Sequence, residues 1–298
     1  MSAAASEPSA LNAATLAALG KLRFATFPSP NASSIGEERS RRRGRSNELI
    51  DFRQYIAGDD LRDIDWNAVA RHDELYTRIY AQEISQPVEF YVDASPSMRW
   101  GKDGEKFRVA KELALGLTTV ASASGCSAKI ILGHHAPIPH LRGHSIAEAQ
   151  AQVEALEFDD ISLEVPPIDV VLVERAKRKA HAMVVVISDG YEFEAIQPAL
   201  RALHARGVPI GFLQVLSPFE LSPQLDADFT LKDGLGEVRV SGNEDTLARY
   251  DARLNEFLGM WRKAIKRVKG NYALIRSDAS LASLAAKELP QSGLVIRR

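Results

Sequence analysis

The chain has 298 residues, of which 45% are hydrophobic and 26% are charged, and its formal net charge is −2. This composition is typical of a soluble globular protein with one large or two small domains, and the balanced charge gives no overall field that would attract nucleic acid or an anionic membrane. No apolar run approaches the ~18 residues that a membrane-spanning helix needs, and residues 1–8 lack the features of a secretory signal. A single cysteine, Cys126, excludes an internal disulfide, so we expect a cytoplasmic protein with no membrane span.

Residues 1–47 are predicted to form an N-terminal helix followed by a basic linker. Apolar positions between residues 10 and 24 indicate the helix, and residues 27–47 are rich in Pro, Ser and Arg. Five arginines lie within residues 39–45, which makes nucleic-acid binding an alternative function for the chain. We favour a solvated run of charge, without a nucleic-acid partner, because no aromatic residue is interleaved with the arginines.

Residues 48–86 mix acids, arginines and large apolar residues. Leu61, Ile64 and Trp66 are expected to pack inward, while the charged residues form a partly buried ion network that fastens this region to the domain that follows. A partner-binding surface is the alternative interpretation. Residues 75–84 alternate with period two and predict a strand. The block is defined by Asp59, Asp60, Arg62, Asp63, Asp65 and Trp66.

Two apolar runs end abruptly in acidic and hydroxyl side chains. Residues 88–92 read as a buried strand and lead into Asp93, Ser95 and Ser97, while residues 183–187 lead into Asp189. If these strands are parallel neighbours at the switch point of an open sheet, both aspartates face one crevice. Hard oxygen donors on one turn are the ligands that Mg²⁺ prefers. These four residues are therefore predicted to bind Mg²⁺ or Mn²⁺.

Helices and strands alternate along residues 87–298. Helical periodicity is found at residues 104–124, 147–156, 169–181, 195–206, 247–269 and 281–289, and strands are predicted at 128–133, 138–141, 208–215 and 272–275. Residues 217–243 are expected to contain an inserted β-hairpin. The alternation predicts an α/β domain with a doubly wound, mostly parallel sheet.

Two of these motifs resemble known families. Residues 41–98 resemble the signature of the bacterial "domain of unknown function 58" family, in which a block equivalent to Gly58–Trp66 precedes a von Willebrand factor A-like domain. The Asp-x-Ser-x-Ser turn and Asp189 resemble the metal-ion-dependent adhesion site of von Willebrand factor A domains. One departure is that residues 159–169 contain no Thr, which that site normally takes from an intermediate loop; Ser162 and Asp169 are both open as replacements. The resemblance implies a cytoplasmic companion of a MoxR-type AAA+ ATPase, acting in assembly or maturation of other proteins.

Enzymatic functions receive less support from the residues. A phosphatase that forms an aspartyl phosphate would need an acid at Ser95, and residues 143–147 lack the strand-turn-helix context of a nucleophile elbow. His134 and His135 are adjacent and would point apart on a strand. We predict no catalytic residues and keep a metal-dependent hydrolase as the alternative. The favoured function is a protein-binding module whose bound cation accepts an acidic side chain of a partner, next to an exposed rim formed by Met98, Arg99 and Trp100.

Overall fold

The computed structural model describes residues 11–25, 49–56, 60–72, 74–80, 87–100, 105–132, 138–141, 148, 150–151, 153, 166–178, 182–223, 229–233, 236–240 and 244–298. The chain divides into two compact units, one comprising Met1–Ser29 with Gln86–Arg298 and the other Pro30–Ser85. Several predicted features fall outside the described residues: the arginine run at 39–45, Asp59, His134, His135, the Gly143–Ala147 segment and Ser162.

The larger unit is built on a six-stranded sheet in the order β11-β8-β7-β4-β5-β6. Five of these strands are mutually parallel and β6 is antiparallel to β5. Every residue of β4, β7 and β8 is buried, which is why these strands read as largely apolar runs in the sequence; the buried polar residues Glu89 and Gln214 bond to Arg175 and to the Asp189 carbonyl. The strands are β4 Val88–Val92, β5 Ala128–Leu132, β6 Ile138–Leu141, β7 Met183–Ser188, β8 Ile210–Leu216 and β11 Asn271–Arg276.

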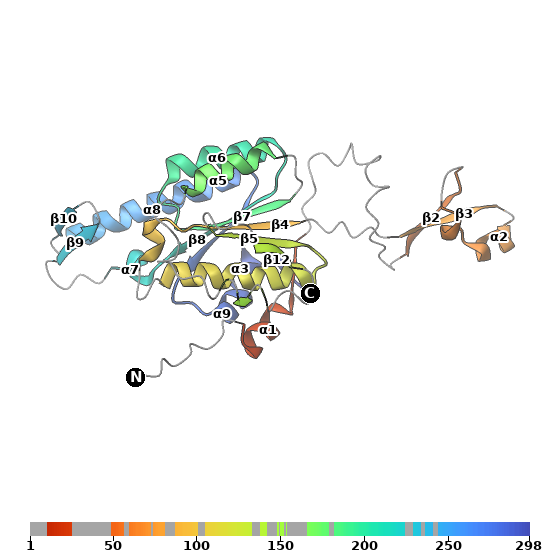
Figure 1. Cartoon of the computed structure of the whole chain (residues 1–298), viewed down its shortest axis with the longest axis horizontal. Coiled ribbons are helices and arrows are strands. Elements are labelled where there is room, and N and C mark those ends of the chain that lie inside the picture. Colours follow the sequence, from red (N-terminus) through yellow and green to blue (C-terminus); the bar gives the residue numbers. More distant parts are fainter. Residues whose placement is uncertain are drawn as a thin grey trace. The chain divides into compact units, whose positions relative to one another are not determined.

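Helices cover both faces of this sheet, as the predicted doubly wound α/β fold requires (Figure 1). One face carries α3 (Glu105–Ala123), α9 (Leu281–Ala286) and α1 (Ala13–Leu19), and the opposite face carries α5 (Ile168–Lys177), α6 (Phe193–Ala205) and α8 (Glu244–Arg267). The sequence predicted α3 and α6 to within two residues at each end. No helix in the described part of the chain combines the length and apolar character needed to cross a bilayer.

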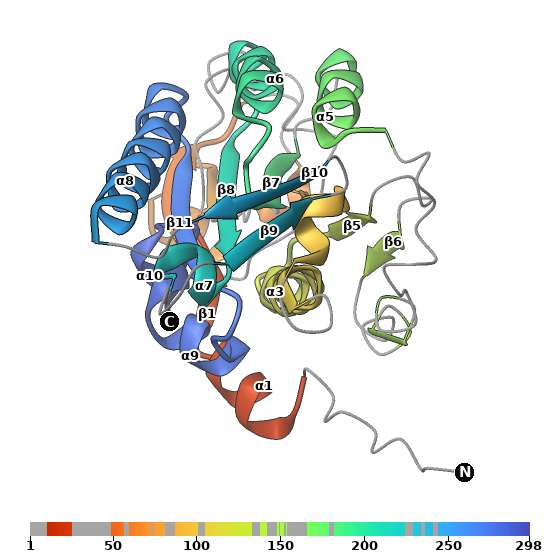
Figure 2. The same ribbon diagram turned by 90° about the vertical axis from the view of Figure 1, so that its left-hand side faces the viewer.

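The connections that follow the neighbouring strands β4 and β7 go to opposite faces of the sheet. From β4 it passes to α3 on one face of the sheet, and from β7 it passes to α6 on the other face. Val92 at the end of β4 pairs with Ile187 near the end of β7, so the loops that follow these strands start side by side and then diverge. Such a divergence leaves a crevice at the carboxyl edge of a parallel sheet, the edge that faces the viewer in Figure 2.

Shorter elements complete the larger unit. The predicted N-terminal helix is confined to α1 and is followed by strand β1 (Leu22–Phe24), which pairs with β12 (Val295–Arg297) near the end of the chain. Strands β9 (Phe229–Asp233) and β10 (Gly236–Val240) pair antiparallel and lie beyond the carboxyl edge of the main sheet (Figures 1 and 2). The remaining elements are the 3₁₀ helix η3 (Pro96–Arg99) and the short helices α7 (Pro218–Leu221) and α10 (Glu288–Gln291).

The smaller unit pairs β2 (Leu49–Gln54) with β3 (Tyr76–Tyr80) around the 3₁₀ helix η2 (Leu61–Asp63) and α2 (Trp66–His72). Asp65 is 8% exposed; its carboxylate accepts from the Asn67 amide and forms an ion pair with Arg78 at 3.0 Å. Ile64 is buried as predicted.

Two apolar residues of the same block differ from the prediction. Leu61 and Trp66 are each 63% exposed, so the expectation that they pack inward is wrong. Asp65 takes the inward position at the start of α2, where it caps the helix and meets Arg78, and the next residue is turned outward.

Candidate functional site

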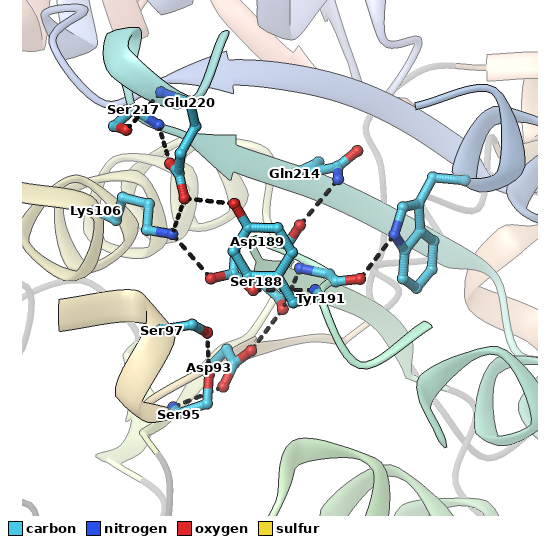
Figure 3. A network of polar contacts seen from close by, with 12 residues as sticks. Asp93, Ser95, Ser97, Lys106, Ser188, Asp189, Tyr191, Gln214, Ser217 and Glu220 are labelled. Carbon is cyan, nitrogen blue, oxygen red and sulfur yellow. Dashed lines mark hydrogen bonds and ion pairs between the residues drawn. The ribbon is translucent and has the colours of Figure 1, made fainter. Parts of the chain in front are cut away.

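The loop of Asp93, Ser95 and Ser97 begins where β4 ends (Figure 3). The Asp93 amide still donates to the Ile187 carbonyl at 2.9 Å, which fixes the loop to β7. The Asp93 carboxylate accepts from the Ser95 amide at 2.8 Å and from the Ser188 hydroxyl at 2.5 Å. Pro96 is the first residue of η3, and this tight turn brings the hydroxyl oxygens of Ser95 and Ser97 to within 3.1 Å of each other. One carboxylate and two hydroxyls thus converge on a single turn.

Asp93 is a buried acid with no cationic partner in the described part of the chain. Its residue exposure is 4%, and burial, together with the neighbouring carboxylate of Asp189, raises the pKa of its carboxyl. No Lys, Arg or His among the described residues forms an ion pair with it. A buried carboxylate of this kind is costly unless a positive charge compensates it. The donor set of hard oxygens therefore fits a divalent cation.

Asp189 lies in the same crevice, but its side chain has other partners. One carboxylate oxygen accepts from the Lys106 ammonium at 2.9 Å and the other from the Tyr191 amide at 3.2 Å. Its backbone carbonyl accepts from the Gln214 amide group at 2.9 Å. As the sequence predicted, Asp93 and Asp189 follow neighbouring parallel strands, β4 and β7, and the Ser188 hydroxyl next to Asp189 donates to the Asp93 carboxylate. The sequence did not predict that Lys106 lies between Asp189 and a second acid, Glu220.

Lys106 is fully buried in the first turn of α3 and has two carboxylate partners. Its ammonium lies 2.9 Å from Asp189 and 2.8 Å from Glu220 of α7, and 5.1 Å from the centre of the Tyr191 ring (Figure 3). Burial acts to raise the pKa of the Glu220 carboxyl, but the Lys106 ammonium holds this pKa below its ordinary value. Glu220 is also fixed by a reciprocal capping box with Ser217.

The loop after β7 is fixed from the side of α8. Gly190 has φ +75°, a conformation that favours glycine, and its carbonyl accepts from the Trp261 indole at 2.9 Å. A Cβ at Gly190 would lie 2.5 Å from the same indole nitrogen. Trp261 is fully buried and stacks on Phe212 of β8 with ring centroids 4.1 Å apart. The position of Asp189 therefore depends on packing between α8 and the sheet.

Further acids lie on the α5 and α6 side of the crevice. Partial burial, followed by the charges of Asp93, Asp169 and Asp189, raises the pKa of Glu192. Asp169 is in the first turn of α5, and its buried Oδ1 has no hydrogen-bond partner among the described residues. Within those residues, no three His, Cys, Asp or Glu side chains form a group that could hold a metal ion. A cation at Asp93 would therefore depend on the serine hydroxyls.

The rim of the crevice differs from its predicted composition. Met98 is 0% exposed and belongs to the core beneath α3, so it is not available to a partner and this part of the prediction is wrong. The 3₁₀ turn of η3 directs Met98 inward, while Arg99 and Trp100 remain exposed, Trp100 at 44%. Two aromatic residues that were not predicted are also exposed: Tyr191, in the loop after β7, at 49%, and Phe219, in α7 after β8, at 42%.

Residues 51–223 match the family described as "Protein of unknown function DUF58", and this match covers more than half of the chain. The chain belongs to the DUF58 family. The DUF58 match starts in β2 of the smaller unit and ends just after α7, so it contains Asp93, Lys106, Asp189 and Glu220. A comparison with curated proteins gives no match.

Proposed function

We propose that this DUF58 protein is a non-catalytic protein-binding module of the von Willebrand factor A-like class. The crevice at Asp93 would be its metal-ion-dependent adhesion site. The observation that carries the proposal is the buried Asp93 carboxylate, which has no ion pair in the described part of the chain and shares its turn with two hydroxyls 3.1 Å apart. Such a group of oxygen atoms is better suited to binding Mg²⁺ or Mn²⁺ than to nucleophilic catalysis.

Asp93, Ser95 and Ser97 are the residues that would hold the cation. Asp169 is the candidate for the intermediate-loop position that lacks Thr, because its buried Oδ1 has no protein partner among the described residues. A bound divalent ion supplies an open coordination position that attracts a carboxylate. The Ser188 hydroxyl and the Ser95 amide keep the Asp93 carboxylate in one orientation before a cation arrives.

Exposed aromatic residues around the crevice support a protein as the partner. Trp100, Tyr191 and Phe219 follow β4, β7 and β8, and neighbouring parallel strands of one sheet bring their loops to the same edge. Aromatic anchors beside a polar centre are the usual composition of an interface hot spot. We propose that a partner presents a Glu or Asp to the cation and apolar side chains to this rim.

The proposed partner is a MoxR-type AAA+ ATPase, with a role in assembly or maturation of other proteins in the cytoplasm. This part of the proposal comes from the resemblance of the Gly58–Trp66 block and the Asp-x-Ser-x-Ser turn to their families.

Binding of the purified ATPase, measured by calorimetry in Mg²⁺ and in chelator, tests the proposal. We expect binding in Mg²⁺ that is lost in chelator, in Asp93→Asn and in Ser97→Ala, but is retained in Ser283→Ala, which removes an exposed hydroxyl of α9. Equal affinity in all of these conditions would exclude the crevice as the docking site. Mg²⁺-dependent hydrolysis of a phosphoester that Asp93→Asn abolishes would instead favour the hydrolase alternative.

A further inference from the structure

A fully buried lysine at the start of a helix requires a specific explanation. The exposed N–H groups of the first turn already carry partial positive charge, so an ammonium there is unfavourable unless acids compensate it. Lys106 has two, Asp189 at 2.9 Å and Glu220 at 2.8 Å, and its side chain is 0% exposed. The three residues come from α3, the loop after β7 and α7, so this contact joins three separate segments at the carboxyl edge.

The same contact changes what Asp189 can do. In the predicted site Asp189 is a metal ligand together with Asp93, Ser95 and Ser97. In the structure its two carboxylate oxygens accept from Lys106 and from the Tyr191 amide, and Gln214 holds its backbone carbonyl. Asp93, by contrast, accepts hydrogen bonds from a hydroxyl and an amide and has no ion pair among the described residues. The two acids therefore differ in whether the protein itself supplies a positive charge.

We infer that Lys106 is a built-in counter-charge that keeps Asp189 out of the cation's coordination shell, so that Asp189 is a positioning residue and Asp93 is the ligand. The inference rests on the proposed metal site and adds a determinant of its affinity. Because Lys106 neutralises one acid beside the site, the cation is held less tightly than it would be by the acids alone. More of the cation's charge is then left for the acidic side chain of a partner.

Calorimetric titration of the full chain with Mn²⁺ tests this assignment through a charge-conserving pair. In Lys106→Met/Asp189→Asn, both members of the ion pair lose their charge while the net charge of the site is unchanged. We expect this double variant to bind Mn²⁺ with an affinity close to that of the native protein. Lys106→Met alone should bind about tenfold more tightly or better, because one positive charge near the cation is gone. Arg108→Gln removes a charge from an exposed pair of the same helix and should have no effect.

The outcomes separate the inference from the proposed function. If the native protein binds no Mn²⁺, both fail. If the native protein binds Mn²⁺ and Asp93→Asn does not, but the double variant also fails to bind, Asp189 is a ligand and only the inference is overturned. Weaker or unchanged binding by a folded Lys106→Met protein would also overturn it. If Lys106→Met does not fold, the double variant alone decides between the two roles of Asp189.

Discussion

Replacing Lys106 with Met should destabilise the larger unit severely in the absence of divalent ions. The substitution keeps the length of the side chain but leaves Asp189 and Glu220 without their shared ammonium, and the side chains of these acids are only 2% and 10% exposed. Loss of one member of a buried ion pair typically costs about 3 to 5 kcal/mol, since the remaining charge is uncompensated. Two acids share this lysine, so we expect the upper half of that range in the free energy of unfolding at pH 7.

The pH dependence of the same loss gives a second readout. In the native protein the pKa of Glu220 lies below its ordinary value of 4.5, so its stabilising contribution is present above that pH and is lost as the pH falls through the lowered pKa. Without Lys106, burial dominates and raises the pKa of Glu220 in the folded state. Lowering the pH from 7 towards 4.5 then relieves the variant, because its Glu220 takes up a proton, while the native protein keeps this contribution. The difference between their free energies of unfolding should therefore narrow between pH 7 and about 4.5.

Urea denaturation of both proteins in chelator, followed by near-UV circular dichroism, measures this difference. Arg249→Met is the matched control, because Arg249 forms an ion pair with Asp245 in which the side chains are 77% and 71% exposed. Such a pair should contribute less than about 1 kcal/mol. A Lys106→Met loss as small as that of the control, or one that does not change with pH, would refute the argument that this charge cluster is buried and coupled.

Three further variants probe other parts of the structure. Gly190→Ala should lower the free energy of unfolding by at least about 1 to 3 kcal/mol, because alanine is strained at φ +75° and its Cβ would collide with Trp261, and thermal unfolding would show it. Met98→Ala should cost about 2 to 5 kcal/mol through the cavity it leaves, and a cost near zero by urea denaturation would contradict its burial. Asp65→Asn should speed amide hydrogen exchange in β3 at neutral pH, because it removes the carboxylate that accepts from Arg78. That hydrogen bond lowers the pKa of Asp65 below its ordinary 3.8, so the effect should fade only as the pH falls through this lowered pKa.

The sequence was sufficient to predict an α/β fold with a mostly parallel sheet and the two neighbouring strands that Asp93 and Asp189 follow. Largely apolar runs at residues 88–92 and 183–187 predicted central parallel strands, and the polar residues after each run lie at one edge, where Ser188 donates to Asp93. These inferences succeed because a strand buried on both faces is mostly apolar, with exceptions such as Glu89 that have a buried partner, and because parallel strands end at the same edge.

Contacts between distant segments could not be read in the same way. Lys106 meets partners 83 and 114 positions later in the chain, and no local pattern distinguishes it from a lysine on the solvent face of α3. The one signal was its position beside Phe107 at the start of a predicted amphipathic helix. Met98 and Trp66 were misassigned for a related reason, since the direction of a side chain in a one-turn 3₁₀ segment or at a helix start depends on the backbone around it.

The fluorescence of the Trp261 indole can also report on the conformation of the loop after β7. The chain has three tryptophans, and the other two, Trp66 and Trp100, are 63% and 44% exposed. A Trp66→Phe/Trp100→Phe protein would therefore emit from one shielded fluorophore whose N–H is bonded to the Gly190 carbonyl, one residue after Asp189. Its emission wavelength and quenching would report directly on whether that loop shifts when a cation or a partner is added.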